Sequence, residues 1–152
     1  MWVVFNNNVT VNMSSVIKFE NTTYGTGIDF YCNGLNFNLR FKNHEDRKTA
    51  NEEIRKAITE KTKLAAIQRS KGYATRPTFS VKQIGELIAF VKDIKPDLIC
   101  MVDNCYGEFT EALEPTHVGA DVFVGSMMKN LGAGFALSGG YCVGRRDVIE
   151  DI

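Results

Sequence analysis

The stretch that decides the fold is Ala120-Asp121-Val122-Phe123-Val124-Gly125-Ser126-Met127-Met128-Lys129-Asn130-Leu131-Gly132-Ala133-Gly134. It consists of a short apolar run, a serine, a lysine three residues further on, and a turn that contains glycines. A second stretch, Leu98 to Tyr106, carries an apolar run that ends in Asp103. Both runs are typical of buried strands. If the two strands are neighbours, their polar ends meet at one edge of a sheet, where open α/β folds bind their ligands.

An amine and a carboxylate at that edge indicate a site for pyridoxal phosphate. This cofactor needs a lysine for covalent attachment and a carboxylate that keeps its pyridine nitrogen protonated, because the protonated ring is the better electron sink. Lys129 and Asp103 are the candidates for these two roles. The phosphate group needs hydroxyl and backbone N–H donors, which Ser126 and the turn at 132–134 can supply.

Composition narrows the class of ligand. The chain has 152 residues, the length of one domain, with 18 Lys plus Arg and 18 Asp plus Glu. Because no basic cluster stands out, we expect neither nucleic acid nor an anionic membrane as a partner, and a small molecule is favoured. No apolar run approaches the ~18 residues of a membrane helix and no leader pattern is visible, so we expect neither a membrane span nor a secretion signal. The cysteine pattern described next leads us to expect a cytoplasmic protein.

The cysteines fit a reducing compartment. They show no C-x-x-C spacing, and we read them as reduced residues, two of them in buried strands. The four are Cys32, Cys100, Cys105 and Cys142.

Hydrophobic periodicity predicts the remaining elements. Alternation over 35–41 predicts a half-buried edge strand, and helical spacing over 46–60 predicts a helix with one packed face. The run 64–67 reads as a buried strand. Ser80 followed by Gln83 forms a capping-box pattern at the start of a helix whose apolar stripe continues to residue 94.

The order of these elements predicts an α/β fold with a mainly parallel sheet flanked by helices, covered on both faces. Residues 141–143 read as a return strand. We expect residues 41–152 to form part of a cofactor-binding large domain. Residues 1–40 form a separate N-terminal segment that is hard to assign. Its asparagine-rich part, 1–35, favours turns, and we predict at most one or two edge strands there.

The chain from about residue 61 to 150 resembles the methionine gamma-lyase family, also called aluminium resistance proteins, within the fold type I (aspartate aminotransferase-like) pyridoxal phosphate enzymes. The motifs that carry the resemblance are Ile67-Gln68-Arg69-Ser70-Lys71-Gly72-Tyr73 with Arg76-Pro77, Val102-Asp103-Asn104-Cys105-Tyr106-Gly107-Glu108-Phe109, Glu114-Pro115-Thr116 with Val118-Gly119-Ala120-Asp121, Gly125-Ser126 with Lys129-Asn130, and Gly139-Gly140-Tyr141.

The resemblance implies a carbon–sulfur lyase that acts on a sulfur-containing amino acid, in the manner of cystathionine beta-lyase or methionine gamma-lyase. It implies that Lys129 binds the cofactor covalently, Asp103 pairs with the pyridine nitrogen and Ser126 binds the phosphate. Tyr106 would hydrogen-bond the phenolic oxygen of the cofactor, and Cys105 would be the small residue that lets the chain pass its ring. Full-length members of the family are expected to be homo-oligomers.

The sequence departs from the family pattern in two ways. Leu131 and Ala133 stand where the family usually has proline and glycine, and Leu137-Ser138 replaces a Pro-Thr pair. Family members are also much longer, so we read the chain as the middle of the large domain, a truncated form. Two alternatives to the lyase stay open: a non-catalytic remnant of the same fold, and a pyridoxal phosphate-dependent aminotransferase.

The roles of several polar residues have more than one reading from the sequence. Gln68, Arg69, Ser70 and Arg76 could face the cofactor or substrate, or form an ordinary surface loop. His44 and His117 have no partners at metal-ligand spacing, which favours solvated or locally bonded histidines. Lys129 must be neutral to act as a base, and burial beside a cationic group would lower its pKa in that direction.

Overall fold

The structure is a computed structural model. It describes residues 2–5, 9–12, 16–21, 26–32, 35–41, 44–72, 78–132 and 134–152, with side chains from residue 51 onward. The strands are β1 Trp2–Phe5, β2 Val9–Asn12, β3 Val16–Asn21, β4 Thr26–Cys32, β5 Leu35–Phe41, β6 Leu64–Gln68, β7 Ile99–Asp103, β8 Val122–Ser126 and β9 Gly140–Gly144. The helices are α1 His44–Ala57, α2 Val81–Ile94 and α3 Arg146–Glu150, with 3-10 turns at Pro115–Val118 and Asn130–Gly132.

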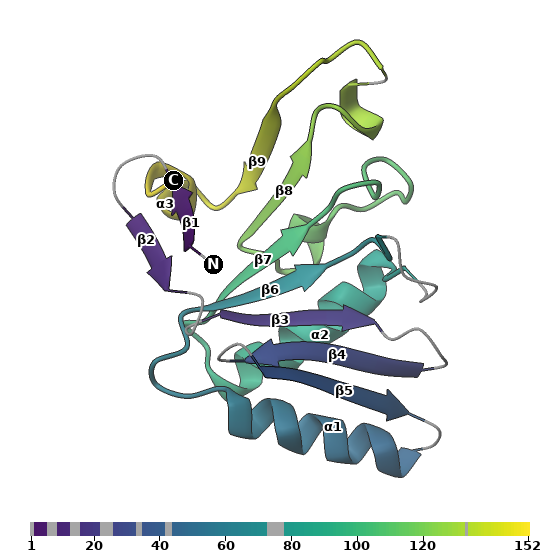
Figure 1. The fold of residues 1–152 in the computed structure, drawn as a ribbon, viewed down its shortest axis with the longest axis vertical. Coiled ribbons are helices and arrows are strands. Elements are labelled where there is room, and N and C mark those ends of the chain that lie inside the picture. Colours follow the sequence, from purple (N-terminus) through teal and green to yellow (C-terminus); the bar gives the residue numbers. More distant parts are fainter. Residues whose placement is uncertain are drawn as a thin grey trace.

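A seven-stranded sheet in the order β5-β4-β3-β6-β7-β8-β9 forms the centre of the molecule (Figure 1). Its central strands β3, β6, β7 and β8 are parallel, whereas β4, β5 and β9 run antiparallel to their neighbours. The predicted α/β fold, with a parallel central sheet flanked by helices, is therefore confirmed. The predicted edge strand over 35–41 and the return strand over 141–143 are also confirmed, as β5 and β9.

The N-terminal part differs from the prediction. Residues 2–32 form four strands rather than one or two, and β3 lies inside the main sheet, parallel to β6. Strands β1 and β2 form a separate two-stranded sheet. The sheet thus contains strands from both sides of residue 40. Pairing of β3 with a strand more than 40 residues further on is a non-local contact that local composition does not encode.

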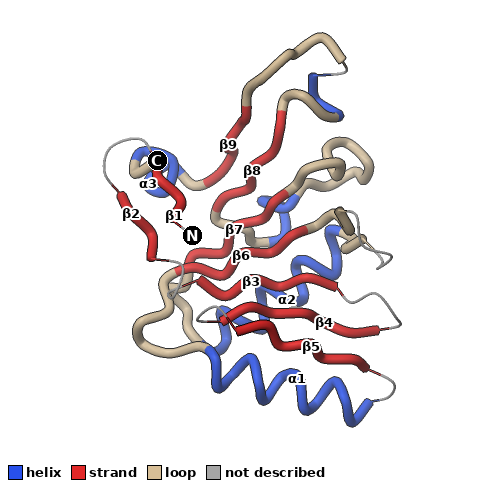
Figure 2. The backbone as a smooth tube through the Cα atoms, viewed as in Figure 1, coloured by secondary structure: helices blue, strands red, loops and turns tan. Residues whose placement is uncertain are grey.

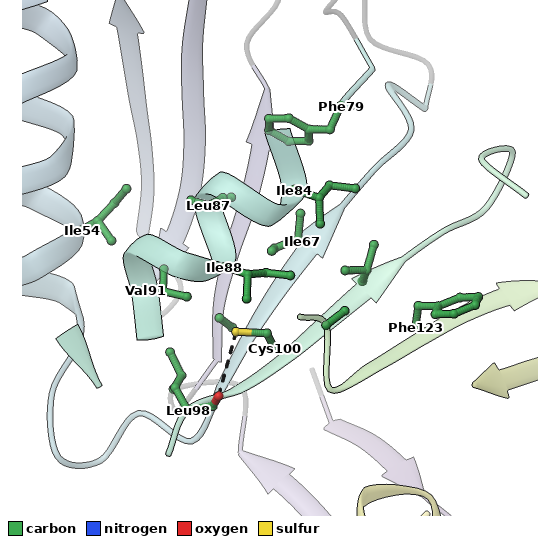
Figure 3. Packing of buried hydrophobic residues seen from close by; sticks show 13 residues of the cluster. Ile54, Ile67, Phe79, Ile84, Leu87, Ile88, Val91, Leu98, Cys100 and Phe123 are labelled. Carbon is green, nitrogen blue, oxygen red and sulfur yellow. Dashed lines mark hydrogen bonds between the residues drawn. The ribbon is translucent and has the colours of Figure 1, made fainter. Parts of the chain in front are cut away.

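Helix α2 begins at a capping box and buries one side. Ser80 accepts a hydrogen bond from the Gln83 N–H, and the Gln83 side chain accepts one from the Ser80 N–H, which is the predicted capping box. The buried side of the helix packs on β6 and β7, where Ile67 and Cys100 are almost fully buried (Figure 3). Val102 of β7 is fully buried as well. Ile54 brings α1 into the same cluster.

Both long helices therefore pack on one face of the sheet, and the described residues bear out helical cover for that face. Alternate residues of β6 and β7, including Ala66, Met101 and Asp103, lie on the opposite face and are half-buried. Cys100 is buried as predicted, but Cys142 is exposed because β9 is an edge strand. Along the part of the chain that the structure describes, none of the helices is long and apolar enough to cross a bilayer.

Candidate active site

The carboxyl ends of three parallel strands meet at one edge of the sheet. Gln68 of β6 pairs with Asp103 of β7, and Asp103 pairs in turn with Val124 of β8, which ends two residues later at Ser126. The loops that follow β6 and β7 leave the sheet on the same side (Figure 2). The prediction that the two motif strands lie side by side is confirmed.

Lys129 lies in the turn after β8 and reaches back toward the end of β7. Its Nζ atom lies 4.6 Å from the centroid of the Tyr106 ring, within the range of a cation–π interaction. A hydrogen bond to the Cys105 side chain, with smaller contributions from the nearby Tyr106 and Asp103, raises the pKa of Lys129. The structure therefore brings together Asp103, Cys105, Tyr106 and Lys129.

The direction of that pKa shift differs from the one expected for a buried base. Lys129 is only half-buried, and its hydrogen bond to Cys105 outweighs the opposing effect of burial. The raised pKa favours the ammonium form of the side chain. Its Nζ must lose a proton before it can act as a nucleophile or base.

Cys105 connects the carboxylate to the lysine. Its backbone N–H donates to Asp103 Oδ1 at 3.1 Å, so the residue turns directly over the end of β7. Burial, followed by a hydrogen bond to Asp103, raises the pKa of the Cys105 thiol. The thiol thus lies between the side chains of Asp103 and Lys129.

Tyr106 adopts an unusual backbone conformation. Its φ is 69°, in the left-handed region, and its side chain is 55% exposed. A side chain other than glycine costs about 1–2 kcal/mol in that conformation. Such strain persists where surrounding contacts over-determine the position, and it clusters at functional sites.

The turn from Ser126 to Gly134 is tightly folded. Ser126 Oγ accepts a hydrogen bond from the Met128 N–H at 3.2 Å. A Cβ at Gly132 would overlap the Met127 carbonyl group, and Gly134 has a φ of 83°. Glycine is therefore required at 132 for space and favoured at 134 for conformation. Ala133 lies outside the described residues.

Arg69 is a buried residue that holds a neighbouring loop. Its side chain is 1% exposed, and Nη1 donates to Asn104 Oδ1 at 2.8 Å and to the Gly107 carbonyl at 2.9 Å. Its Nη2 donates to Glu111 Oε1 at 2.7 Å. The reading of Arg69 as part of an ordinary surface loop is therefore wrong, because its partners lie in a loop 35 to 42 residues further along.

The structure describes two of the other three polar residues whose roles the sequence left undecided. Gln68 donates from its side chain to the Ser70 carbonyl at 3.3 Å, and Ser70 is buried. Arg76 lies outside the described residues. Sequence reasoning missed Glu108, which is 5% exposed and accepts a hydrogen bond from the Tyr141 hydroxyl at 2.7 Å. Acidic residues at 108, 111 and 114, following a buried strand, are the signal that could have indicated a buried arginine.

The sequence profile of the methionine gamma-lyase family matches residues 10–152. The chain belongs to this family.

Three relatives show how much of a methionine gamma-lyase family protein the chain spans. The Bacillus subtilis protein YnbB is 55% identical over 106 residues, which is 70% of this chain and 25% of YnbB. A solved Listeria monocytogenes structure, provisionally described as a cystathionine beta-lyase involved in aluminium resistance, is 52% identical with a TM-score of 0.63, covering 65% of this chain and 25% of that one. A Clostridium novyi carbon–sulfur lyase involved in aluminium resistance is 46% identical with a TM-score of 0.61, covering 66% and 24%.

His117 is a histidine whose side chain the structure describes, and it is locally bonded. His117 Nδ1 accepts a hydrogen bond from the Glu114 N–H at 3.2 Å, which agrees with the local role predicted for it. Within the ranges that the structure describes, no group of three or more potential metal ligands occurs.

Proposed function

We propose that the chain forms part of the site of a pyridoxal phosphate-dependent carbon–sulfur lyase that acts on a sulfur-containing amino acid. The observation that carries the proposal is the approach of Lys129 Nζ to Tyr106 and Cys105 at the end of the strand that delivers Asp103. Membership of the methionine gamma-lyase family and similarity to a carbon–sulfur lyase support the same reaction class.

The residues at this edge fit the cofactor. They supply one primary amine, one carboxylate from the neighbouring strand, one aromatic ring and one hydroxyl group, from Lys129, Asp103, Tyr106 and Ser126. The Met128 N–H already donates to that hydroxyl, so Ser126 and this backbone N–H together offer donors of the kind that a phosphate group needs. When bound, pyridoxal phosphate would store the electrons of the bond broken at the substrate α-carbon.

Each side chain then has a defined task. Asp103 would hold a proton on the pyridine nitrogen, and Ser126 would donate to the phosphate group. Lys129 would bind the cofactor and later, as a free amine, take the α-proton of the substrate at Nζ. Because the hydrogen bond to Cys105 raises the pKa of Lys129, the first requirement is loss of a proton at Nζ.

Covalent trapping tests the proposal at the lysine. The protein is mixed with pyridoxal phosphate, reduced with borohydride and digested, and the labelled peptide is identified by mass spectrometry. We expect the label on Lys129 and its loss in Lys129→Met. The matched control is Lys82→Met, which removes an exposed lysine of α2 and should leave the label in place. A label spread over surface lysines in the wild type would contradict the assignment.

Product analysis separates the lyase from its alternatives. A lyase releases a 2-oxo acid and ammonia from a sulfur-containing amino acid, whereas an aminotransferase yields a 2-oxo acid and an aminated cofactor. A non-catalytic remnant would give neither product.

We further propose a homo-oligomer in the cytoplasm, on the basis of the family. Size-exclusion chromatography with light scattering would test the oligomeric state.

A further inference from the structure

We infer that Arg69 and Tyr141 are positioning residues that clamp the loop 104–114 from two sides and thereby hold Tyr106 and Cys105 against Lys129. The role of Lys129 in this inference rests on the proposed function. The contacts of Arg69 and Tyr141 with the loop do not depend on it. Neither residue reaches the reacting group, so each acts through the loop.

Arg69 holds the loop from the side of β6. Its backbone N–H donates to the Asp103 carbonyl at 3.0 Å, and its guanidinium donates to Asn104, to the Gly107 carbonyl and to Thr110. These contacts lie on both sides of Tyr106. A Cβ at Gly107 would collide with the Arg69 side chain, so the loop packs directly on the guanidinium.

Carboxylates complete the clamp on this side. Glu111 Oε1 accepts from Arg69 at 2.7 Å and from the Val81 N–H at 2.9 Å, which ties the loop to the start of α2. Glu114 accepts from the Asn104 side chain at 2.9 Å and from the Phe109 N–H at 2.8 Å. Charge-assisted bonds of this kind are stronger than neutral ones, so the loop has few alternative conformations.

Tyr141 holds the loop from the side of β9. Its hydroxyl donates to Glu108 Oε1 at 2.7 Å, and its ring packs edge-on against Phe123 with 6.0 Å between the centroids. The ring lies over Gly125, where any Cβ would collide with it. Burial and the Glu108 carboxylate raise the pKa of Tyr141, so the hydroxyl remains a donor at neutral pH.

Arg69 and Tyr141 bind the loop 104–114 at points that lie on either side of Tyr106. Arg69 fixes residues 104 and 107, Tyr141 fixes residue 108, and Tyr106 lies between these points with its strained backbone. Lys129 belongs to the β8–β9 connection, the same hairpin that carries Tyr141. The Tyr141–Glu108 hydrogen bond therefore fixes the hairpin relative to the loop, and with it the distance between Lys129 and Tyr106.

Selective lysine chemistry on the chain without added cofactor tests the clamp. Acetic anhydride modifies only the neutral amine, so the rate at Lys129, relative to Lys82 in the same sample, reports how strongly its neighbours hold the ammonium form. Tyr141→Phe keeps the ring and removes the hydroxyl. We expect the relative rate at Lys129 to rise by about twofold or more at pH 8, because the ammonium loses its fixed neighbours.

The matched control is Thr62→Val, which removes a buried hydroxyl that accepts the Thr59 N–H at 3.0 Å before the start of β6, outside the clamp. Its relative rate should equal that of the wild type. An unchanged rate in a folded Tyr141→Phe protein would overturn the inference, and so would an equal rise in Thr62→Val. If cofactor trapping at Lys129 fails while this result holds, the proposed function is wrong and the clamp stands.

Discussion

Charged side chains at the two ends of the parallel strands differ in how deeply they are buried and how fully they are paired. At the amino end, Asp121 precedes β8 and is 5% exposed, and its carboxylate accepts from Lys92 and Arg145 at 2.7 Å each and from the Cys100 N–H at 2.8 Å. At the carboxyl end, Lys129 and Asp103 are half-buried and Tyr106 is strained. There, Arg69 Nε and Glu108 Oε2 are buried without a partner in the described structure.

The comparison contrasts a carboxylate that the protein itself pairs fully with side chains to which the proposed function assigns a ligand. Buried polar atoms are normally hydrogen-bonded, and each exception calls for an explanation. At the amino end the surrounding groups satisfy the carboxylate, so the fold gains from it. At the carboxyl end the buried Arg69 also stabilises the fold, whereas the strained Tyr106 and the half-buried Lys129 lie at the open edge of the sheet.

The largest expected effect is that of Arg69→Met. The substitution leaves Asn104, Glu111 and the Gly107 carbonyl without their donor, and we expect a loss of about 3–5 kcal/mol in the free energy of unfolding. Urea denaturation measures it. Arg55→Met is the matched control, because its pair with Asp93 is exposed and such pairs contribute about 0–1 kcal/mol. Equal losses in the two variants would remove the distinction between a buried and a surface arginine.

Asp121→Asn tests the other end of the strands. The amide keeps the size but weakens two ion pairs and the acceptor of the Cys100 N–H, so we expect a loss of about 2 kcal/mol in the same measurement. The relative acetylation rate at Lys129 should stay at the wild-type value. A change in that rate would show that the two ends are coupled, contrary to the comparison.

Cys100, near the amino end of β7, makes the free energy of unfolding depend on pH. Burial raises the pKa of its thiol from 9.0 to about 12. The unfolded chain therefore loses this proton at a lower pH than the folded protein, and stability falls as pH rises from 9 to 12. The slope attributable to this group is about 1.4 kcal/mol per pH unit. Cys100→Ala should be less stable at pH 8 but should lack this part of the slope, and parallel curves would contradict the assignment.

The smallest effect on stability is expected for Lys129→Met. The side chain is half-buried and its contacts are at the open end, so the free energy of unfolding should change by about 0.5 kcal/mol or less. Cofactor trapping should nevertheless be lost. A thermal unfolding curve shifted as far as that of Asp121→Asn would indicate that Lys129 is a structural residue.

Local signals were sufficient for the elements that carry the candidate site. The capping box at Ser80, the apolar stripe of α2 and the uninterrupted apolar runs of β7 and β8 each specify their element without distant partners. Parallel pairing then follows from the crossover order, so the meeting of Asp103 and Ser126 at one edge could be predicted.

Features that depend on distant partners could not be predicted. The burial of Arg69 depends on carboxylates and carbonyls 35 to 45 residues away, and its sequence neighbours resemble those of a polar surface loop. Strand β3 acquires its place from pairing with β6. The exposure of Cys142 follows from the edge position of β9, which an apolar triplet does not reveal.

The absence of a side chain at Gly125 has a consequence for divergence within the family. The phenol ring of Tyr141 occupies the volume that a Cβ at 125 would need, so the two positions form one steric unit across neighbouring strands. Homologues should therefore change them together: a larger residue at position 125 should accompany a smaller one at 141, and a protein altered at one position alone should recover when the second change is added.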